Sequence, residues 1–509
     1  MATISTAIGT ERLSRVSGYK IKKGFFSNVT PNLPQVIAVF GEANTANQSG
    51  LSLTKREVTS AQEAAEIYGY GSPIHLQMRI LRPTNGDGVG GIPTIVFPQA
   101  EAENAFPASR TWTVLGTATE NATHIVVVNG RRGIDFQNYN FSVVKGDTAN
   151  AIAEKMADAV NGVLSSPVIA TVVTDGVIQF EAKWAGASSD SLNISVDNNQ
   201  KDAGVTYAET GIDTGLGEPD LAPSLSQFGS DWITIVLNPY ASENSTQTLS
   251  TLEQFNGFPD PTSPTGRYSA TVFKPFVALY GQTISDKNDL ADLSEDSINQ
   301  VTNVICPAPN SDGFPFEAAA NVGALLARVA QDTPELDVNA LSYPDMPIPN
   351  DNLIGDMAEY NNRDFLVKRG VSTVILENGA YQIQDLVTTY HPAGENPLQY
   401  SYVRNLFVDF NIKDGYDILE KLNVKDKVLV EDNQVTDSKN SVKPKQWKAV
   451  VFDYFDDLAI AALIREPQFS KDSLQVQVNE INPNRFDTFF RYKRTGIARI
   501  ESTDVEAGF

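Results

Sequence analysis

VTNVICPAPNSDGFPFEAAANVGALLARVAQD, residues 301–332, contains both kinds of element that decide the fold. Residues 301–309 form a short apolar run, which predicts a buried strand. Residues 316–332 predict a long helix directly after it. Strands that alternate with helices indicate a layered α/β core with a partly parallel sheet.

The same alternation continues on both sides of this stretch. Residues 33–41, LPQVIAVFG, predict a buried strand that ends at Gly41. Thr59 or Ser60 can cap the next helix, because Glu63 follows Ser60 by three residues as in a capping box, and Pro73 lies near the first turn of another helix. Further strands are predicted at 232–240 and 270–279, a helix at 245–258, and a hairpin at 371–390 with its turn at Asn378-Gly379.

Residues 106–207 predict a self-contained insert. Two strand patterns precede a helix that carries Ile152, Met156 and Val160 at helical spacing. Two alternating strands then follow, joined by a turn at Thr174-Asp175-Gly176. This β–β–α–β–β order predicts a small α+β domain.

The last part of the chain predicts a helix at 455–467 and strands at 473–483 and 487–494. Asp456 and Asp457 are interpreted as acids that favour a helix N-terminus. A charged interface that also includes Asp453 is the alternative, whereas the spacing of the three carboxylates does not fit a calcium-binding loop.

Charge is divided between the ends of the chain and its middle. The protein has a net charge of −23, yet residues 1–30 have five Lys and Arg against one acid, and residues 484–500 have the same balance. Both ends therefore carry +4 and the rest carries −31. Basic ends on an acidic protein are attracted to other copies of it. Large apolar residues interleave with these charges, so ordered arms that bind a partner are favoured over disordered tails.

Alternating side chains in both ends predict extended strands. Arg491 and Lys493 would share one face, and Phe490 and Tyr492 the other. The same pattern in residues 490–499 argues against a nucleic-acid patch, as does the acidic composition. The candidate arm residues are Tyr19, Lys20, Ile21, Lys22, Lys23, Phe490, Arg491, Tyr492, Lys493, Arg494 and Arg499.

Residues suited to catalysis are few. The three histidines, His75, His124 and His391, do not have metal-ligand spacing, and Cys306 lies in an apolar run that predicts a buried, inert thiol. The glycine-rich stretch 86–91 lacks the strand–loop–helix context of a phosphate-binding loop. We therefore expect no enzyme activity, no cofactor and no metal. A single cysteine and the absence of a long apolar run or a signal-peptide pattern favour a reducing cytoplasm.

In this order, the blocks of the chain resemble contractile tail sheath proteins, in the Mu-like branch of the myophage family. The resemblance covers most of residues 16–480, and no single block is a catalytic signature. The residues that carry it are VSGYKIKKGFFSNVTPNLPQVIAVFGEA (16–43), VTSAQEAAEIYGYGSPIHLQMRIL (58–81), GDTANAIAEKMADAVNG (146–162), the stretch 167–196, WITIVLNPY (232–240), the stretch 315–343 and KRGVSTVILENGAYQIQDLVTTY (368–390).

The resemblance implies a mixed α/β and α+β multidomain fold with extended N- and C-terminal strand arms. The expected parts are an N-terminal linking arm at 1–30, a core at 31–105 and 208–483, an outer domain at 106–207 and a C-terminal linking arm at 484–509. The C-terminal region is longer and more basic than the family pattern. The arms would add strands to a sheet of adjacent subunits and would contribute nothing to the core of their own subunit.

The resemblance also implies mechanical work without catalysis. The subunits would form stacked hexameric rings around a tail tube protein, with baseplate and tail terminator proteins at the ends. Contraction would drive the tube through a host cell envelope. The sheath would be assembled in the host bacterial cytoplasm and would become part of the virion tail. Two other classes stay open: another self-assembling virion structural protein, and an α/β enzyme with a carboxylate site.

Overall fold

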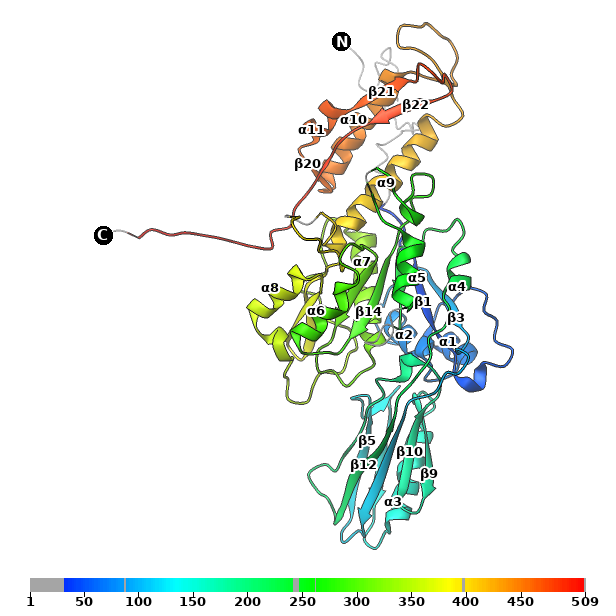
Figure 1. Cartoon of the computed structure of the whole chain (residues 1–509), viewed down its shortest axis with the longest axis vertical. Helices are drawn as coiled ribbons and strands as arrows, with labels where there is room; N and C mark the ends of the chain where they lie inside the picture. The colour runs from blue at the N-terminus through cyan, green and yellow to red at the C-terminus, as the bar shows by residue number, and fades with distance from the viewer. Residues whose placement is uncertain (1–31, 87, 241–246, 261, 396–398, 508–509) are drawn as a thin grey trace, which may run out of the picture.

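The computed structural model describes residues 32–86, 88–240, 247–260, 262–395 and 399–507. The molecule is elongated and has three parts (Figure 1). We call them the body, which holds the central sheet, the insert, which is residues 106–216, and the distal lobe, which begins within α9. The fold is the mixed α/β and α+β architecture that the sequence predicts.

A six-stranded sheet forms the centre of the body. Its order is β15-β14-β13-β1-β3-β2, and all neighbours are parallel except β2 and β3. Every residue of the predicted strand β1 is buried, as expected for a parallel strand covered on both faces. The strands are β1 (Ile37–Glu42), β2 (Arg56–Glu57), β3 (Thr94–Gln99), β13 (Ile235–Leu237), β14 (Val277–Gln282) and β15 (Asn303–Pro307).

Side chains of β1 alternate between two hydrophobic clusters. Ile37 and Val39 pack in the larger cluster with helices α2 and α7, whereas Ala38 and Phe40 pack in a second cluster on the other face. The sheet is therefore the middle layer of three. Helices of the body are α1 (Ala61–Tyr68), α2 (Pro73–Leu81), α4 (Ala222–Ser226), α5 (Gln247–Asn256), α6 (Lys287–Glu295), α7 (Pro315–Asp332) and α8 (Tyr360–Lys368).

Several predicted details of the body are confirmed. The Ser60 hydroxyl accepts a hydrogen bond from Glu63 N at 3.1 Å, and Pro73 begins α2. The hairpin of β16 (Thr373–Glu377) and β17 (Ala380–Asp385) turns at Asn378 and Gly379, both with positive φ. The strand predicted at 270–279 begins only at Val277, because Pro275 has no N–H for a ladder and the residues before it form turns.

The insert has two sheets and one helix. A four-stranded sheet has the order β12-β4-β10-β9, and a three-stranded sheet has the order β11-β5-β8. Its strands are more numerous than the four predicted, and β12 extends beyond the predicted boundary at residue 207. The elements are β4 (Ser109–Gly116), β5 (Ala122–Val128), β6 (Gly133–Ile134), β7 (Gln137–Asn138), β8 (Asn140–Val143), α3 (Ala149–Asn161), β9 (Val168–Thr174), β10 (Val177–Ala182), β11 (Ile194–Asp197) and β12 (Val205–Asp213).

The hydrophobic core of the insert continues into the body, so the expectation of a self-contained unit is wrong. Leu76 from α2 and Phe314 and Phe316 from the start of α7 belong to the same cluster as the insert. Trp184 of the insert lies with its ring centroid 5.5 Å from that of Phe314. The two chain crossings meet at an antiparallel bridge between Phe106 and Leu216.

The distal lobe is connected to the body by helix α9 (Val403–Asn423), which contributes side chains to the cores of both parts. The lobe packs Trp447, Val451 and Tyr454 of α10 around its own cluster. Its other elements are β18 (Val428–Leu429), β19 (Ser441–Val442), α10 (Pro444–Ile460), β20 (Ile464–Arg465), α11 (Pro467–Ser473), β21 (Gln475–Val478), β22 (Phe486–Phe489) and β23 (Lys493–Arg494).

The helix predicted at 455–467 is wrong in position. Helix α10 begins at Pro444 and ends at Ile460. Trp447, Val451 and Tyr454 share one buried face, and Gln446 Oε1 accepts from Lys443 N at 3.0 Å at the helix start. The helix ends where Ala462 adopts a positive φ of 56°. Within the part of the chain that the structure describes, no helix is long and apolar enough to cross a membrane.

Candidate subunit interfaces

The first part of the predicted C-terminal arm belongs to its own subunit. Strand β22 pairs antiparallel with β21, and β23 pairs with β20. Phe490 lies between them in the core of the distal lobe, with ring centroids 5.5 Å from Tyr416 and 5.2 Å from Phe455. The expectation that residues 484–494 contribute nothing to their own core is therefore wrong, because Phe486, Phe490 and Tyr492 pack against it.

Charged and polar contacts fix the next residues to α9. Tyr492 donates from its hydroxyl to Asp409 Oδ1 at 2.9 Å, and Arg494 donates from Nε to the same oxygen at 2.7 Å. Burial alone would lower the pKa of Arg494, but the bonds to Asp409 outweigh it and raise that pKa above its usual value. Lys493 pairs with Glu466 at the end of β20. Arg491 is exposed and lies over the Phe489 ring.

Arg499 is the last residue held by the body. Its guanidinium forms ion pairs with Asp337 and Asp385 and lies 3.9 Å over the ring of Tyr402. Residues 500–507 are all exposed and extend away from the body (Figure 1). Ile500 and Val505 are 86% and 82% exposed. We call residues 500–507 the tail.

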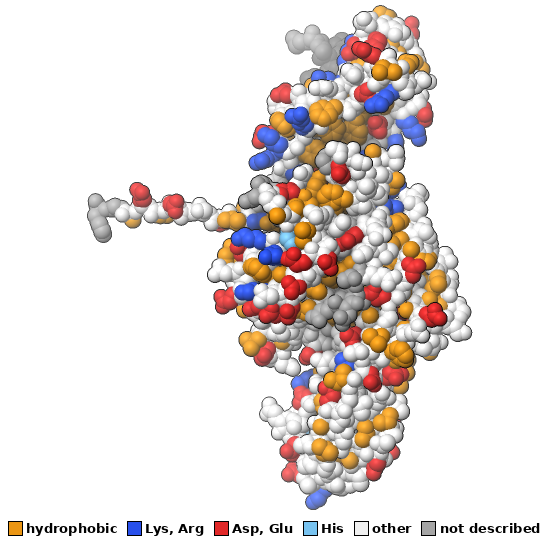
Figure 2. Space-filling view, in the orientation of Figure 1, with side chains coloured by type: hydrophobic (Ala, Val, Ile, Leu, Met, Phe, Trp, Pro, Cys, Tyr) orange, Lys and Arg blue, Asp and Glu red, His pale blue; other side chains and the backbone are white. Residues whose placement is uncertain are grey.

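A basic groove lies beneath the point where the tail leaves the body. It encloses about 920 Å³ and is lined by residues of α9, β20, β23 and the segment up to Arg499. In the described part of the chain, Arg465 and Arg491 on its wall form no ion pair with another residue. Figure 2 shows Lys and Arg side chains gathered there, whereas acids lie along the tail and on the body below. The cationic side chains of the groove are Arg404, Arg465, Arg491, Lys493, Arg494 and Arg499.

The sheet of β21 and β22 has two strands, and neither pairs with a third strand among the described residues. Two open edges allow an extended segment to add on either side. The N-terminal arm candidates Tyr19, Lys20, Ile21, Lys22 and Lys23 lie outside the described residues. Their role in joining subunits stays a prediction, as does that of Phe490, Arg491, Tyr492, Lys493, Arg494 and Arg499.

Asp453, Asp456 and Asp457 lie in the second half of α10, so the interpretation as acids at a helix N-terminus is wrong. Asp456 pairs with Lys471 of α11 at 2.6 Å. Burial, with Asp453 and Asp456 nearby, raises the pKa of Asp457. Asp453 is exposed, and the role of the three carboxylates in a charged interface stays a prediction.

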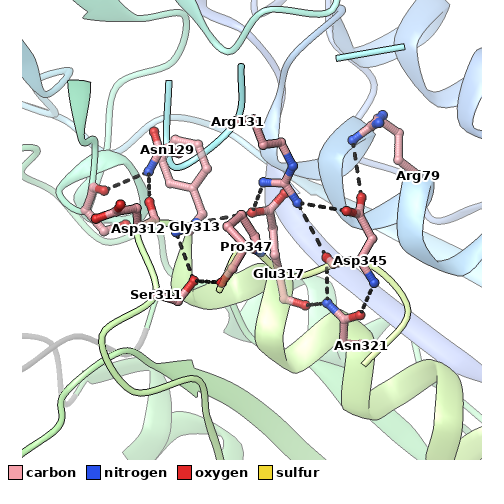
Figure 3. Close-up of polar contacts among 12 residues, drawn as sticks. Arg79, Asn129, Arg131, Ser311, Asp312, Gly313, Glu317, Asn321, Asp345 and Pro347 are labelled. Atoms are coloured by element: carbon pink, nitrogen blue, oxygen red, sulfur yellow. Dashed lines mark hydrogen bonds and ion pairs between the residues drawn. The ribbon is translucent and has the colours of Figure 1, made fainter. Parts of the chain in front are cut away.

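A buried ion pair joins the insert to the body, and nothing in the sequence pattern indicated it. Arg131, after β5, donates from Nη1 to Glu317 Oε2 in α7 at 2.7 Å, although the two residues are 186 positions apart (Figure 3). Glu317 is 1% exposed. Asp345 lies on the other side of Arg131, with its Oδ1 3.4 Å from Nη2. Burial alone would lower the pKa of Arg131, but Glu317 and Asp345 outweigh it and raise that pKa.

Amide side chains complete this junction. Asn129 donates to the backbone oxygens of Ser191 and Asp312, at 2.9 and 3.1 Å. Asn321 of α7 donates to Asp345 O at 3.0 Å and accepts from Asp345 N at 2.8 Å (Figure 3). The loop that carries Asp345 is therefore fixed to the same helix as Glu317, so the insert is held to a rigid surface.

The three histidines and Cys306, which were considered as catalytic or metal-binding residues, lie in different elements of the fold. His75 is buried in α2, its Nδ1 accepts from Gly71 N at 2.9 Å, and burial lowers its pKa to about 4. His124 contacts Tyr207 OH and Lys201 O in the insert, and His391 contacts Thr389 O. Burial raises the pKa of the Cys306 thiol, which lies in β15. Among the described residues, no three His, Cys, Asp or Glu side chains are grouped to hold a metal ion.

The solved structures to which this chain is similar include sheath proteins. They are a sheath tail protein from Desulfitobacterium hafniense (TM-score 0.43, 9% identity, 94% of this chain and 100% of that one), the contracted sheath of the anti-feeding prophage (0.43, 9%, 98% and 99%) and the contracted sheath of the PVC extracellular contractile injection system (0.45, 8%, 97% and 99%). With TM-scores below 0.5, these likenesses carry no argument about the function of this chain.

No protein-family model matches the sequence. Among curated proteins, the chain is 22% identical over 446 residues to the Mu-like prophage FluMu tail sheath protein of Haemophilus influenzae. The match covers 84% of this chain and 84% of that protein. The similarity therefore spans most of both chains rather than one shared motif. This similarity confirms the predicted resemblance of the chain to tail sheath proteins of the Mu-like group.

Proposed function

We propose that this protein is the structural subunit of a contractile tail sheath. The observation that carries the proposal is the match to a Mu-like tail sheath protein over 84% of both chains. The subunits polymerise as stacked hexameric rings around a tail tube and contract to drive the tube through a host envelope. Baseplate and tail terminator proteins contact the two ends of the sheath. The sheath assembles in the bacterial cytoplasm and becomes part of the virion tail. The work is mechanical, so no catalytic group is required.

Contacts between copies use the C-terminal tail and the distal lobe. In the part of the chain that the structure describes, the tail forms no hydrogen bond or ion pair with its own subunit, and its apolar residues Ile500 and Val505 are available to a partner. Its acids Glu501, Asp504 and Glu506 complement the basic groove of a second copy. An open edge of the β21–β22 sheet accepts an arm of a neighbour by strand addition.

Strand addition suits a lattice that must move without coming apart. Backbone hydrogen bonds fix the register of an added strand, while the residues at the root of the arm change their backbone angles. Here the root follows Arg499, where the ion pairs to Asp337 and Asp385 end. Bodies can therefore rotate relative to one another while the tail stays attached to its neighbour.

Electron microscopy of the purified protein at high concentration tests the proposal. We expect long hollow tubes or rings, of the contracted kind because no inner tube is present. Co-expression with the tail tube protein of the same virus should give longer, narrower tubes with a filled centre. Protein that stays monomeric at high concentration in several salts would overturn the proposal, and assemblies without helical or sixfold symmetry would favour another virion structural protein.

A further inference from the structure

The insert has a second attachment to the body, separate from the ion pair of Arg131. Residues 184–188 of the insert lie against the carboxyl end of β1, where Glu42 is the last strand residue. Glu42 is 1% exposed. Ser188 donates from its hydroxyl to Glu42 Oε2 at 3.0 Å and accepts from Trp184 Nε1 at 2.9 Å. A hydrogen-bonded row therefore connects the insert core to the central sheet.

The backbone of the insert closes over the same carboxyl group. A Cβ atom added at Gly186 would lie 2.6 Å from Glu42 Oε1, and Gly186 has a φ of 147°. Only glycine allows the chain to approach so closely in this conformation. Glu101, from the segment after β3, holds the neighbouring residue by accepting from Ala185 N at 3.0 Å. Two carboxyl groups of the body thus contact one short segment of the insert.

We propose that the Glu42 carboxyl is a proton-dependent latch that holds residues 184–188 of the insert against the end of β1. Among the described residues no cation is paired with this carboxyl, so its neutral form fits the site. In its charged form it is a buried anion beside Glu101, and hydration of that anion requires the segment to move away. The inference does not depend on the proposed sheath function.

The groups around Glu42 come from every element packed against it. They are Glu101, the buried Tyr240 after β13, and Glu218, which acts on Tyr240. Lys183 precedes the segment in the sequence, but its Nζ donates to Leu164 O at 3.0 Å. Burial, and then the nearby Glu101, raises the pKa of Glu42 to about 8 despite its hydrogen bonds. Burial raises the pKa of Glu218 to about 7 and lowers that of Lys183 to about 8.

The sign of the effect follows from these values. When the segment opens, the pKa of Glu42 returns toward its ordinary value of 4.5, so opening releases a proton between pH 4.5 and 8. The latch is complete below pH 4.5 and is lost as the pH rises through 8. Lys183 titrates between 8 and its ordinary 10.5, outside this window. Glu218 titrates within it and must be tested separately.

Hydrogen exchange of the full chain at several pH values between 5 and 8 tests the latch. After correction for intrinsic exchange, we expect the opening constant of residues 185–190 to rise by up to about tenfold per pH unit. Glu42→Gln, which keeps the size and neutral charge, should abolish this slope. Glu218→Gln and the exposed Glu295→Gln should retain it.

A flat wild-type profile, or the same slope in Glu42→Gln, would overturn the latch. If that variant does not fold, the wild-type protein alone still tests the latch. The pH dependence of exchange at residues 185–190 is then compared with that of the β16–β17 hairpin, which serves as an internal reference. A slope at residues 185–190 with none at the hairpin supports the latch, whereas equal slopes at both sites show a general loss of stability and refute it.

Discussion

Arg131 of the insert and Glu317 of α7 form a buried ion pair, with Nη1 and Oε2 2.7 Å apart. Removing one partner of such a pair leaves the other charge buried without compensation. We expect Arg131→Ala to lower the free energy of unfolding by about 3–5 kcal/mol, as measured by urea denaturation. Arg132→Ala is the matched control, because its side chain is 60% exposed, and it should change stability by less than about 0.5 kcal/mol. Equal effects of the two variants would contradict the role given to Arg131.

Deleting the insert should expose apolar surface of the body. Replacement of residues 107–215 by a Gly/Ser linker removes the partners of Leu76, Phe314 and Phe316, so we expect the product to aggregate. The same deletion with Phe314→Ser and Phe316→Ser should be more soluble in a sedimentation assay. A single deletion that is as soluble as the full chain would show that the insert is a separate unit after all.

Two truncations should separate assembly from folding. A chain that ends at Arg499 loses only the exposed tail, so its thermal melting should match the full chain while tubes or rings no longer form. A chain that ends at Asn484 also loses Phe490 and Tyr492 from the distal core, and its melting temperature and helical circular dichroism should fall. If the chain that ends at Arg499 still assembles, the tail does not link subunits.

Charge reversal in the basic groove should weaken assembly without unfolding the subunit. Arg465→Glu with Arg491→Glu removes two exposed cations that have no ion-pair partner among the described residues. Since exposed pairs contribute only about 0–1 kcal/mol each, tubes should persist at low salt and dissociate at a lower salt concentration than the wild type. Lys145→Glu, exposed on the insert, is the control in a light-scattering salt titration. Unchanged salt sensitivity of the double variant would exclude the groove from the interface.

Cys306 should be unreactive in the folded protein. It is fully buried in β15, and burial raises the pKa of its thiol, so the thiolate that reacts is absent at neutral pH. A thiol-reactive dye should label no cysteine under native conditions and one per chain in guanidinium chloride. Rapid labelling of the native protein would mean that the central sheet opens at its β15 edge.

Local patterns predicted the elements of the body well. Strand β1 was predicted from its run of apolar residues, and helix α1 from the cap formed by Ser60 and Glu63. Both signals are local, so the sequence alone was sufficient. The start of α10 was missed, although Trp447 and Val451 carry the helical period, because the prediction placed weight on Asp456 and Asp457. The acids lie near the end of the helix, and one pairs with Lys471 instead.

Contacts between distant parts of the chain could not be predicted. The alternation of Phe490 and Tyr492 correctly indicated extended backbone, but the same pattern suits a strand added to a neighbour and one packed on its own α9. Arg131 and Glu317 have no local signal at all, because each is an ordinary charged residue until the fold brings them together. Periodicity identifies a buried face and not the surface that covers it.

Helix α9 has a mechanical consequence. Its 21 residues give it a length of about 30 Å, and Leu406 and Phe410 pack in the body while Val408 and Ile412 pack in the distal lobe. Because one continuous helix is shared by the two cores, a rotation of the body is transmitted to the distal lobe. A sharp kink in the helix would disrupt its backbone hydrogen bonds. A modest turn of the body therefore becomes a larger sweep at the far end of the lobe. The body and the distal lobe would therefore move as one lever, and the tail leaves the body near the point about which this lever turns.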